Sequence, residues 1–166
     1  MQVSLVVFTV LFSVAVVAAW PDPAPKCPKN WSLFNGTSCL QLFKMKEPWH
    51  EARRQCKFNQ ADADLVVVNT EEKKSYVHTM VHAKPPLFSC GITGISEYWI
   101  GGHDSHKEGR FEWLDTFHVL DYTNWDRWEP NNSWGEDCIE MQYTDGKWND
   151  EDCNERRCFV CEKPAN

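Results

Sequence analysis

Residues 129–150, EPNNSWGEDCIEMQYTDGKWND, hold the most informative pattern in the sequence. It contains three oxygen-rich groups in succession: Glu129-Pro130-Asn131, then Glu136-Asp137, then Asn149-Asp150. Each group alone is common in acidic loops. Their succession within so short a stretch predicts that side-chain oxygens from two loops surround one cation. Ca²⁺ is the expected cation, because it takes about six to eight oxygen ligands.

The negative charge of the chain is concentrated in the same region. The formal net charge of the 166 residues is −7, and the segment from Glu129 to Asp152 alone holds eight carboxylates against one lysine. A solvated acidic surface is the simplest explanation of such a cluster. A bound hard cation is the more specific explanation, because it converts the repulsion among crowded carboxylates into a stabilising attraction to the ion. The rest of the chain is close to neutral, so binding to nucleic acid, which needs a basic surface, is unsupported.

The N-terminal segment 1–19 is apolar and carries no charged side chain. It ends in Ala18-Ala19, and small residues of this kind are typical of a signal-peptidase site. A membrane anchor is the alternative, since the run approaches the roughly 20 residues that cross a bilayer. No Lys or Arg precedes the run to fix its orientation. We therefore expect a signal peptide and a secreted, extracellular protein with no membrane span after cleavage.

Eight cysteines follow this segment, and an even number in an oxidising compartment predicts four disulfides. They are Cys27, Cys39, Cys56, Cys90, Cys138, Cys153, Cys158 and Cys161. Spacing alone cannot choose among the roughly 100 pairings. Cys158 and Cys161 also have the spacing of a redox or zinc motif. Residues three apart in a strand face opposite sides, however, and no second such motif is present.

Residues 27–163 predict one α+β domain, between a proline-rich lead-in at 20–26 and a tail at 164–166. Helices are expected at 49–58 behind Pro48 and at 71–83 behind Asn69 or Thr70. Short strands or buried runs are expected at 39–45, 65–68, 98–101, 111–113, 138–142, 147–148 and 158–162. The segment 115–137 is too long for an ordinary connection, and such loops in compact domains are usually functional.

Taken together, these residues resemble the C-type lectin domain over nearly all of 27–162. The motifs in the family's order are Cys27-Pro28-x-x-Trp31, a helix ending at Cys56, Trp99-Ile100-Gly101-Gly102, the three groups of 129–150, and Phe159-Val160-Cys161-Glu162. The resemblance implies two helices packed on two small antiparallel sheets, with a long calcium-binding loop region. It also implies the pairs Cys27 with Cys39, Cys56 with Cys161, and Cys138 with Cys153, which leaves Cys90 with Cys158.

Two calcium sites follow from the same resemblance. The principal site takes Glu129, Asn131, Glu136, Asn149 and Asp150, the set that the acidic pattern had already suggested, with a cis peptide before Pro130. The auxiliary site takes Asp104, Glu108, Asn132, Asp137 and Glu136, the last through its backbone. Asn132 stands where many members of the family have Asp, which removes one negative charge from the auxiliary site.

The resemblance implies that two neighbouring sugar hydroxyls bind at the principal site. Glu129 and Glu136 then accept hydrogen bonds, while Asn131 and Asn149 donate them. In the family, Glu-Pro-Asn accompanies mannose, fucose and N-acetylglucosamine, whereas galactose binders usually carry Gln-Pro-Asp. We expect a lectin for glycans with terminal mannose-type sugars, including those on microbial surfaces, that acts as a monomer or homodimer.

Two other classes of function compete with this prediction. A protein-interaction module on the same fold would use calcium only for structure. A glycosidase would need a carboxyl group with a raised pKa, whereas carboxylates on calcium are held ionised, so we do not expect an enzyme.

Three further residues have open interpretations, and two more are candidate modification sites. Trp134 either stacks on a sugar ring or anchors its loop. His78 and His82 could hold zinc, but a solvated helix face is the simpler explanation. Asn35 and Asn30 stand in acceptor sequences for glycosylation.

Overall fold

The computed structural model describes residues 24–83, 97–114 and 118–166. Its elements are β1 (Ser32–Phe34), β2 (Ser38–Glu47), α1 (Trp49–Asn59), β3 (Asp64–Leu65), α2 (Glu71–His82), β4 (Tyr98–His103), β5 (Glu112–Trp113), β6 (Cys138–Met141), β7 (Trp148–Glu151) and β8 (Arg157–Pro164). The expected helices and strands are therefore present, with ends shifted by a few residues. The predicted signal peptide at 1–19 lies outside the described residues. Among those residues, no helix has the length and apolarity to cross a membrane.

One connected sheet carries these strands, in the order β1-β2-β8-β4-β6-β7, with β3 beside β8 and β5 beside β4. The strands pair antiparallel except for β4 and β8, which run parallel and align Tyr98 with Cys158 and Trp99 with Phe159. The two small antiparallel sheets expected from the sequence are joined by this parallel contact. The join forms because β4 is buried along its whole length, between β8 and β6.

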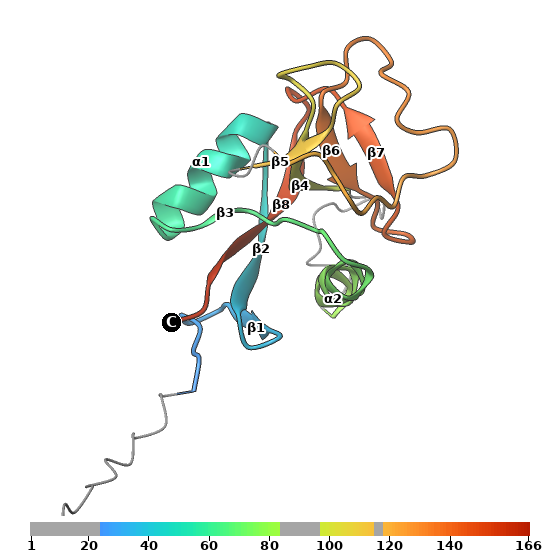
Figure 1. The fold of residues 1–166 in the computed structure, drawn as a ribbon. Coiled ribbons are helices and arrows are strands. Elements are labelled where there is room, and N and C mark those ends of the chain that lie inside the picture. The colour runs from blue at the N-terminus through green and yellow to red at the C-terminus, as the bar shows by residue number, and fades with distance from the viewer. Residues whose placement is uncertain (1–23, 84–96, 115–117) are drawn as a thin grey trace, which may run out of the picture.

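The two helices lie on different sides of the β2–β8 strand pair (Figure 1). The buried residues of α1 are Trp49, Ala52 and Cys56, the helical spacing expected of an amphipathic helix. In α2, the Thr70 side chain accepts a hydrogen bond from the Lys73 backbone N–H at 3.1 Å. Thr70 is therefore the N-cap, which decides between the two residues that the sequence left open.

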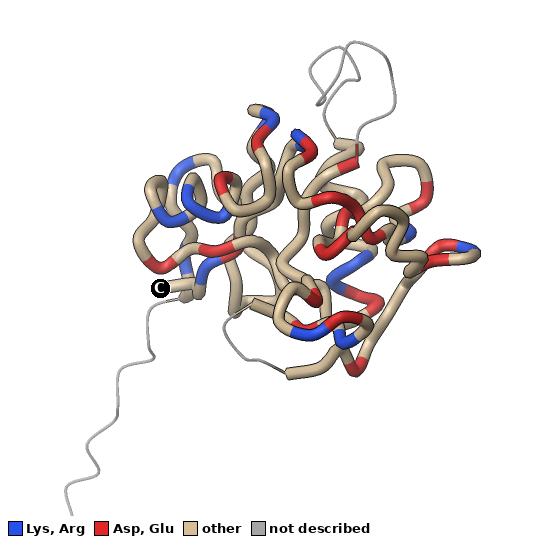
Figure 2. Tube along the Cα trace, turned by 90° about the horizontal axis from the view of Figure 1, so that it is seen from above, with Lys and Arg blue, Asp and Glu red and all other residues tan. Residues whose placement is uncertain are grey.

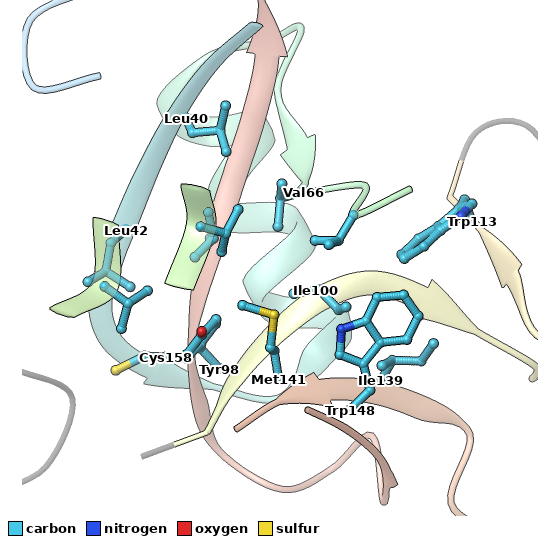
Figure 3. Packing of buried hydrophobic residues seen from close by; sticks show 14 of the residues in the cluster. Leu40, Leu42, Val66, Tyr98, Ile100, Trp113, Ile139, Met141, Trp148 and Cys158 are labelled. Carbon is cyan, nitrogen blue, oxygen red and sulfur yellow. The ribbon is translucent and has the colours of Figure 1, made fainter. Parts of the chain in front are cut away.

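Trp148 lies at the centre of the core beneath the long loop. Its side chain is fully buried, and Ile139, Met141 and Trp113 surround it (Figure 3). The ring of Trp125, from the long loop, packs against Trp148 at a centroid distance of 5.8 Å. The backbone N–H of Trp148 donates to the Asn124 carbonyl at 2.9 Å. The core thus holds the first part of the loop against β7.

Three of the four implied disulfides are present: Cys27–Cys39, Cys56–Cys161 and Cys138–Cys153. Cys158 is also disulfide-bonded. Its implied partner, Cys90, lies outside the described residues, so that pair stays a prediction. Because Cys158 and Cys161 are both in disulfides, neither is available for the redox or zinc chemistry that their spacing allowed.

Candidate metal centre

The candidate ligands come from two loops and one strand at the same end of the molecule. Figure 1 shows the turn between β4 and β5 in yellow beside the long loop before β6 in orange. The backbone N–H of Asp104 donates to the Asp137 carbonyl at 3.0 Å, which ties the first loop to the second. The strand β7 supplies Asn149 and Asp150.

Asp150 holds the loop that carries Glu129 and Asn131. Its side chain is fully buried, and its two oxygens accept the backbone N–H groups of Asn131 at 3.0 Å and Asn132 at 2.8 Å. The Glu129–Pro130 peptide is cis, as the resemblance implied. The amide nitrogen of Asn131 donates to Glu129 Oε2 at 2.6 Å. These contacts bring three of the five expected ligands of the principal site together.

Glu136 closes the same loop on itself. Its Oε2 accepts the Ser133 backbone N–H at 2.9 Å, and its own backbone N–H donates to Asn132 Oδ1 at 3.0 Å. The charge of Asp150 acts on the Glu136 carboxyl, which places the two groups in one electrostatic cluster. Glu136 therefore joins the principal site from the far side of the loop.

Asn149 takes its orientation from a residue that the sequence analysis did not single out. On adjacent strands it lies opposite Glu140, and its amide nitrogen donates to Glu140 Oε1 at 3.1 Å. Glu140 is in turn paired with Arg157, at 2.7 Å. The alternation of faces along the predicted strand 138–142 could have pointed to Glu140. Its pairing with Arg157 could not be predicted, because Arg157 is distant in sequence.

The carboxylates of the principal site repel one another. Burial raises the pKa of Glu129, and the charges of Asp150 and Glu136 raise it further, against the hydrogen bond from Asn131. Burial likewise raises the pKa of Glu136, with Asp150 adding to the effect. Within the described chain, none of these three carboxylates forms an ion pair with Lys or Arg. Crowded, partly buried oxygens without a cationic side chain fit a hard metal cation.

The auxiliary site shows a second sign of a cation-binding role. Asp104 is 1% exposed, and its Oδ2 accepts the Gly109 backbone N–H at 2.8 Å. Its Oδ1 is buried and has no hydrogen-bond partner among the described residues. Burial raises the pKa of Asp104 to about 6, and the charges of Glu108 and Asp137 add to this effect. A buried carboxylate oxygen is costly without a partner, so Asp104 fits the role of calcium ligand.

The remaining expected ligands are placed less tightly. Glu108 is exposed, and its negative charge helps to raise the pKa of Asp104. Asn132 contributes its amide oxygen to the Glu136 N–H, so this oxygen already faces the loop interior. Asp137 is joined to Asp104 through its backbone carbonyl. The structure thus brings the auxiliary residues near one another without direct side-chain contacts among them.

Trp134 does not anchor its loop, because its side chain is 102% exposed. Trp125 performs that role instead, by packing on Trp148. The ring of Trp134 is therefore exposed, and its stacking on a sugar stays a prediction.

The histidine pair of α2 is not on a fully solvated face. His78 Nε2 lies 3.1 Å from the Tyr143 carbonyl, and the His82 ring stacks on the Tyr143 ring at 4.1 Å. The pair thus packs against the turn between β6 and β7. Asn30 and Asn35 are both exposed in turns near β1, where glycosylation stays a prediction.

Comparison with known proteins shows a family match over most of the domain. A model of the lectin C-type domain matches residues 45–163. The mouse CD209 antigen-like protein C is 33% identical over 141 residues, which are 84% of this chain and 70% of that protein. The human CD209 antigen is 30% identical, but the match covers 31% of its length.

The solved structures give the same picture. The cow C-type carbohydrate-recognition domain of CD23, studied in the presence of a GlcNAc2Man3 oligosaccharide, has a TM-score of 0.71 and 29% identity. The match covers 86% of this chain and 98% of that one.

Proposed function

This chain belongs to the family of C-type lectin domains, and from that premise we propose that it is a secreted, calcium-dependent lectin for mannose-type sugars. It is a binding domain and not an enzyme, since its relatives are carbohydrate-recognition domains. The observation that carries the proposal is the cluster of Glu129, Glu136 and Asp150, in which the charge of Asp150 raises the pKa values of both glutamates. Among the described residues, none of the three forms an ion pair with Lys or Arg.

The calcium-binding part of the proposal assigns a role to each residue. Glu129, Asn131, Glu136, Asn149 and Asp150 would hold the principal ion. Asp150 also positions the loop, because its two oxygens accept the N–H groups of Asn131 and Asn132. When bound, calcium supplies the positive charge to which two neighbouring sugar hydroxyls attach.

The sugar-binding part rests on alternating acceptors and donors around that position. Glu129 and Glu136 accept hydrogen bonds from the hydroxyl protons, and the amides of Asn131 and Asn149 donate to the hydroxyl oxygens. Asn131 and Glu129 already lie side by side, 2.6 Å apart through their polar atoms. In the family this Glu-Pro-Asn arrangement accompanies mannose, fucose and N-acetylglucosamine.

The exposed Trp134 ring extends the proposed sugar site. It stands two residues before Glu136 on the same loop, and aromatic rings pack well against the apolar face of a sugar. We propose glycans with terminal mannose-type sugars as the ligands, microbial surfaces among their carriers, and a monomer or homodimer as the acting form. Because single lectin sites are usually weak, multivalent display would raise the avidity.

The test is retention of the oxidised, refolded protein on immobilised mannose, with calcium and then with a chelator. Immobilised galactose serves as the control column. Retention on mannose that the chelator reverses is the expected result. A protein that is correctly disulfide-bonded and binds calcium but passes through both columns would contradict the proposal, and would favour a protein-interaction module that uses calcium for structure.

A further inference from the structure

We propose that the β4–β5 hairpin holds a zinc ion through His103, His106 and Glu112, three side chains that are not among the proposed calcium ligands. The candidate ligand atoms of these three side chains all lie within 4.8 Å of one another. Across the residues that the structure describes, this is the one group of three or more His, Cys, Asp or Glu side chains gathered so closely. The sequence analysis gave these residues no role.

The register of the hairpin explains why the three side chains meet. His103 at the end of β4 is paired directly with Glu112 at the start of β5. Directly opposite residues of an antiparallel pair project from the same face, with their Cβ atoms about 5 Å apart. His106 comes from the turn that connects the two strands. The sheet therefore fixes two ligands, and a short turn supplies the third.

Burial distinguishes this group from a chance surface cluster. Glu112 is 5% exposed and His103 is 6% exposed, so both are held by surrounding packing. The His103 ring packs edge-on against Trp49 of α1, with the centroids 5.2 Å apart. A buried carboxylate needs a charged or hydrogen-bonding partner, and His106 Nδ1 contacts Glu112 Oε1 directly.

The donor set favours zinc over calcium. Two imidazoles and one carboxylate are the ligand types of tetrahedral zinc sites, whereas calcium takes oxygen ligands. His103 Nδ1 lies 2.8 Å from Ser105 Oγ. When Nδ1–H donates to that hydroxyl, Nε2 keeps the lone pair that a metal requires, and such an outer hydrogen bond is typical of metal-binding histidines.

Space for a further ligand adjoins the two histidines of the group. A cavity of about 360 Å³ is lined by His103, Ser105 and His106 of the hairpin, by Trp113 and Leu114, and by Trp49, His50 and Arg53 of α1. A site with three protein ligands keeps one position open to water or to another molecule. A simple ion pair would account for the contact between His106 and Glu112. It would not account for the convergence of His103 on the same point.

The experiment is zinc titration by calorimetry on the oxidised protein, with calcium at saturating concentration so that the calcium ligands are occupied. Co²⁺ in place of zinc gives a visible absorption spectrum that reports imidazole coordination. The variants are His106→Gln, Glu112→Gln and, as matched control, the double substitution His78→Gln/His82→Gln. The control removes the chain's other close histidine pair, whose ring centroids are 4.2 Å apart.

The expected result is one zinc ion per chain and a loss of affinity of roughly tenfold or more in His106→Gln and Glu112→Gln, with the control unchanged. The His106 side chain is 56% exposed, so His106→Gln tests ligation without disturbing the core. Near-ultraviolet circular dichroism verifies the fold of each variant. Absence of zinc binding in the wild type, undiminished binding in His106→Gln, or loss of binding only in the control would overturn the proposal. Retention on mannose is measured in parallel, so failure of the zinc site is distinguishable from failure of the lectin function.

Discussion

Two groups of carboxylates lie near β7 and differ in what neutralises them. Arg157 pairs with Glu140 at 2.7 Å, with Glu151 at 2.6 Å and with Glu155 at 3.2 Å. Among the described residues, the carboxylates of Glu129, Glu136 and Asp150 form no ion pair with Lys or Arg. Figure 2 colours the acidic residues red and the basic ones blue along the backbone. The first group is neutralised by a cation of the chain itself and serves stability, whereas under the proposed function the second is neutralised by calcium from solution.

Carboxylates on the other half of the sheet follow the first pattern. Asp64 pairs with Arg53 and Lys57, and Glu162 pairs with the buried Lys73. These carboxylates are thus neutralised by cationic side chains of the fold, unlike Glu129, Glu136 and Asp150. Four predictions test this contrast.

The largest effect is expected from Arg157→Ala, which removes the internal cation. It leaves Glu140 buried and unpaired, and it also removes the guanidinium that lies 5.8 Å from the Trp99 ring centre. We expect the free energy of unfolding to fall by about 3–5 kcal/mol with calcium present. Denaturant titration measures it. Arg156→Ala is the control, because Arg156 pairs with Glu47 at the surface, where we expect a loss below about 1 kcal/mol. Equal effects for the two variants would contradict the contrast.

The second largest effect is expected from changing the hydrogen-bond donors and acceptors around the proposed calcium ion. The double substitution Glu129→Gln/Asn131→Asp keeps the charge but exchanges which residue accepts and which donates. Mannose hydroxyls would then meet unmatched partners, and we expect mannose affinity to fall by roughly 10- to 100-fold while calcium still binds. Competition for a mannose column measures the loss, and the same assay with galactose shows whether that sugar is admitted. Unchanged mannose affinity would show that these residues do not contact sugar.

A smaller effect is expected from pH, with opposite signs without and with calcium. In metal-free protein the raised pKa of Asp104, about 6, means that the folded state binds a proton more tightly than the unfolded state. The stability contributed by Asp104 is then present at about pH 4 and lost as the pH rises to 6. With calcium, protons compete with the ion, and calcium and mannose affinities fall as the pH falls from 7 to 5.

The stability part of this prediction is isolated by Asp104→Asn. The difference in free energy of unfolding between wild type and this variant, without metal, should decrease as the pH rises from about 4 to 6. An increase over that interval would show that Asp104 is held ionised by something other than calcium. Mannose affinity that stays constant down to about pH 4 would contradict the calcium bridge.

The smallest effect is expected from Asn132→Asp, which restores a charge to the auxiliary site. An aspartate oxygen can still accept the Glu136 N–H, now 3.0 Å from Asn132 Oδ1. We expect calcium affinity at this site to rise by roughly 3- to 10-fold, because ligand charge tunes calcium affinity. Calorimetric titration resolves the two classes of site. Asn154→Asp, on an exposed turn outside both sites, is the control and should leave both affinities unchanged.

Local patterns in the sequence were sufficient for the elements and for much of the candidate site. The spacing of Trp49, Ala52 and Cys56 predicted α1, and the order of oxygen-bearing residues in 129–150 predicted which residues meet around Asp150. Both predictions succeed because the residues on which they depend are close in sequence or lie in one strand and the loop beside it. Trp134 stayed ambiguous, since exposure depends on what the rest of the chain covers.

The sequence alone was sufficient to recognise the family and the concentration of carboxylates between Glu129 and Asp152, and the family resemblance implied the three disulfides that the structure shows. Only the tertiary structure decided which of those carboxylates are neutralised inside the fold. Arg157 comes from β8, outside the acidic segment, and reaches Glu140 and Glu151 because the sheet brings these strands together. The hairpin register likewise decided that His103 and Glu112 meet. The sequence gives the charged residues, but which of them pair depends on distances that are set only in the folded chain.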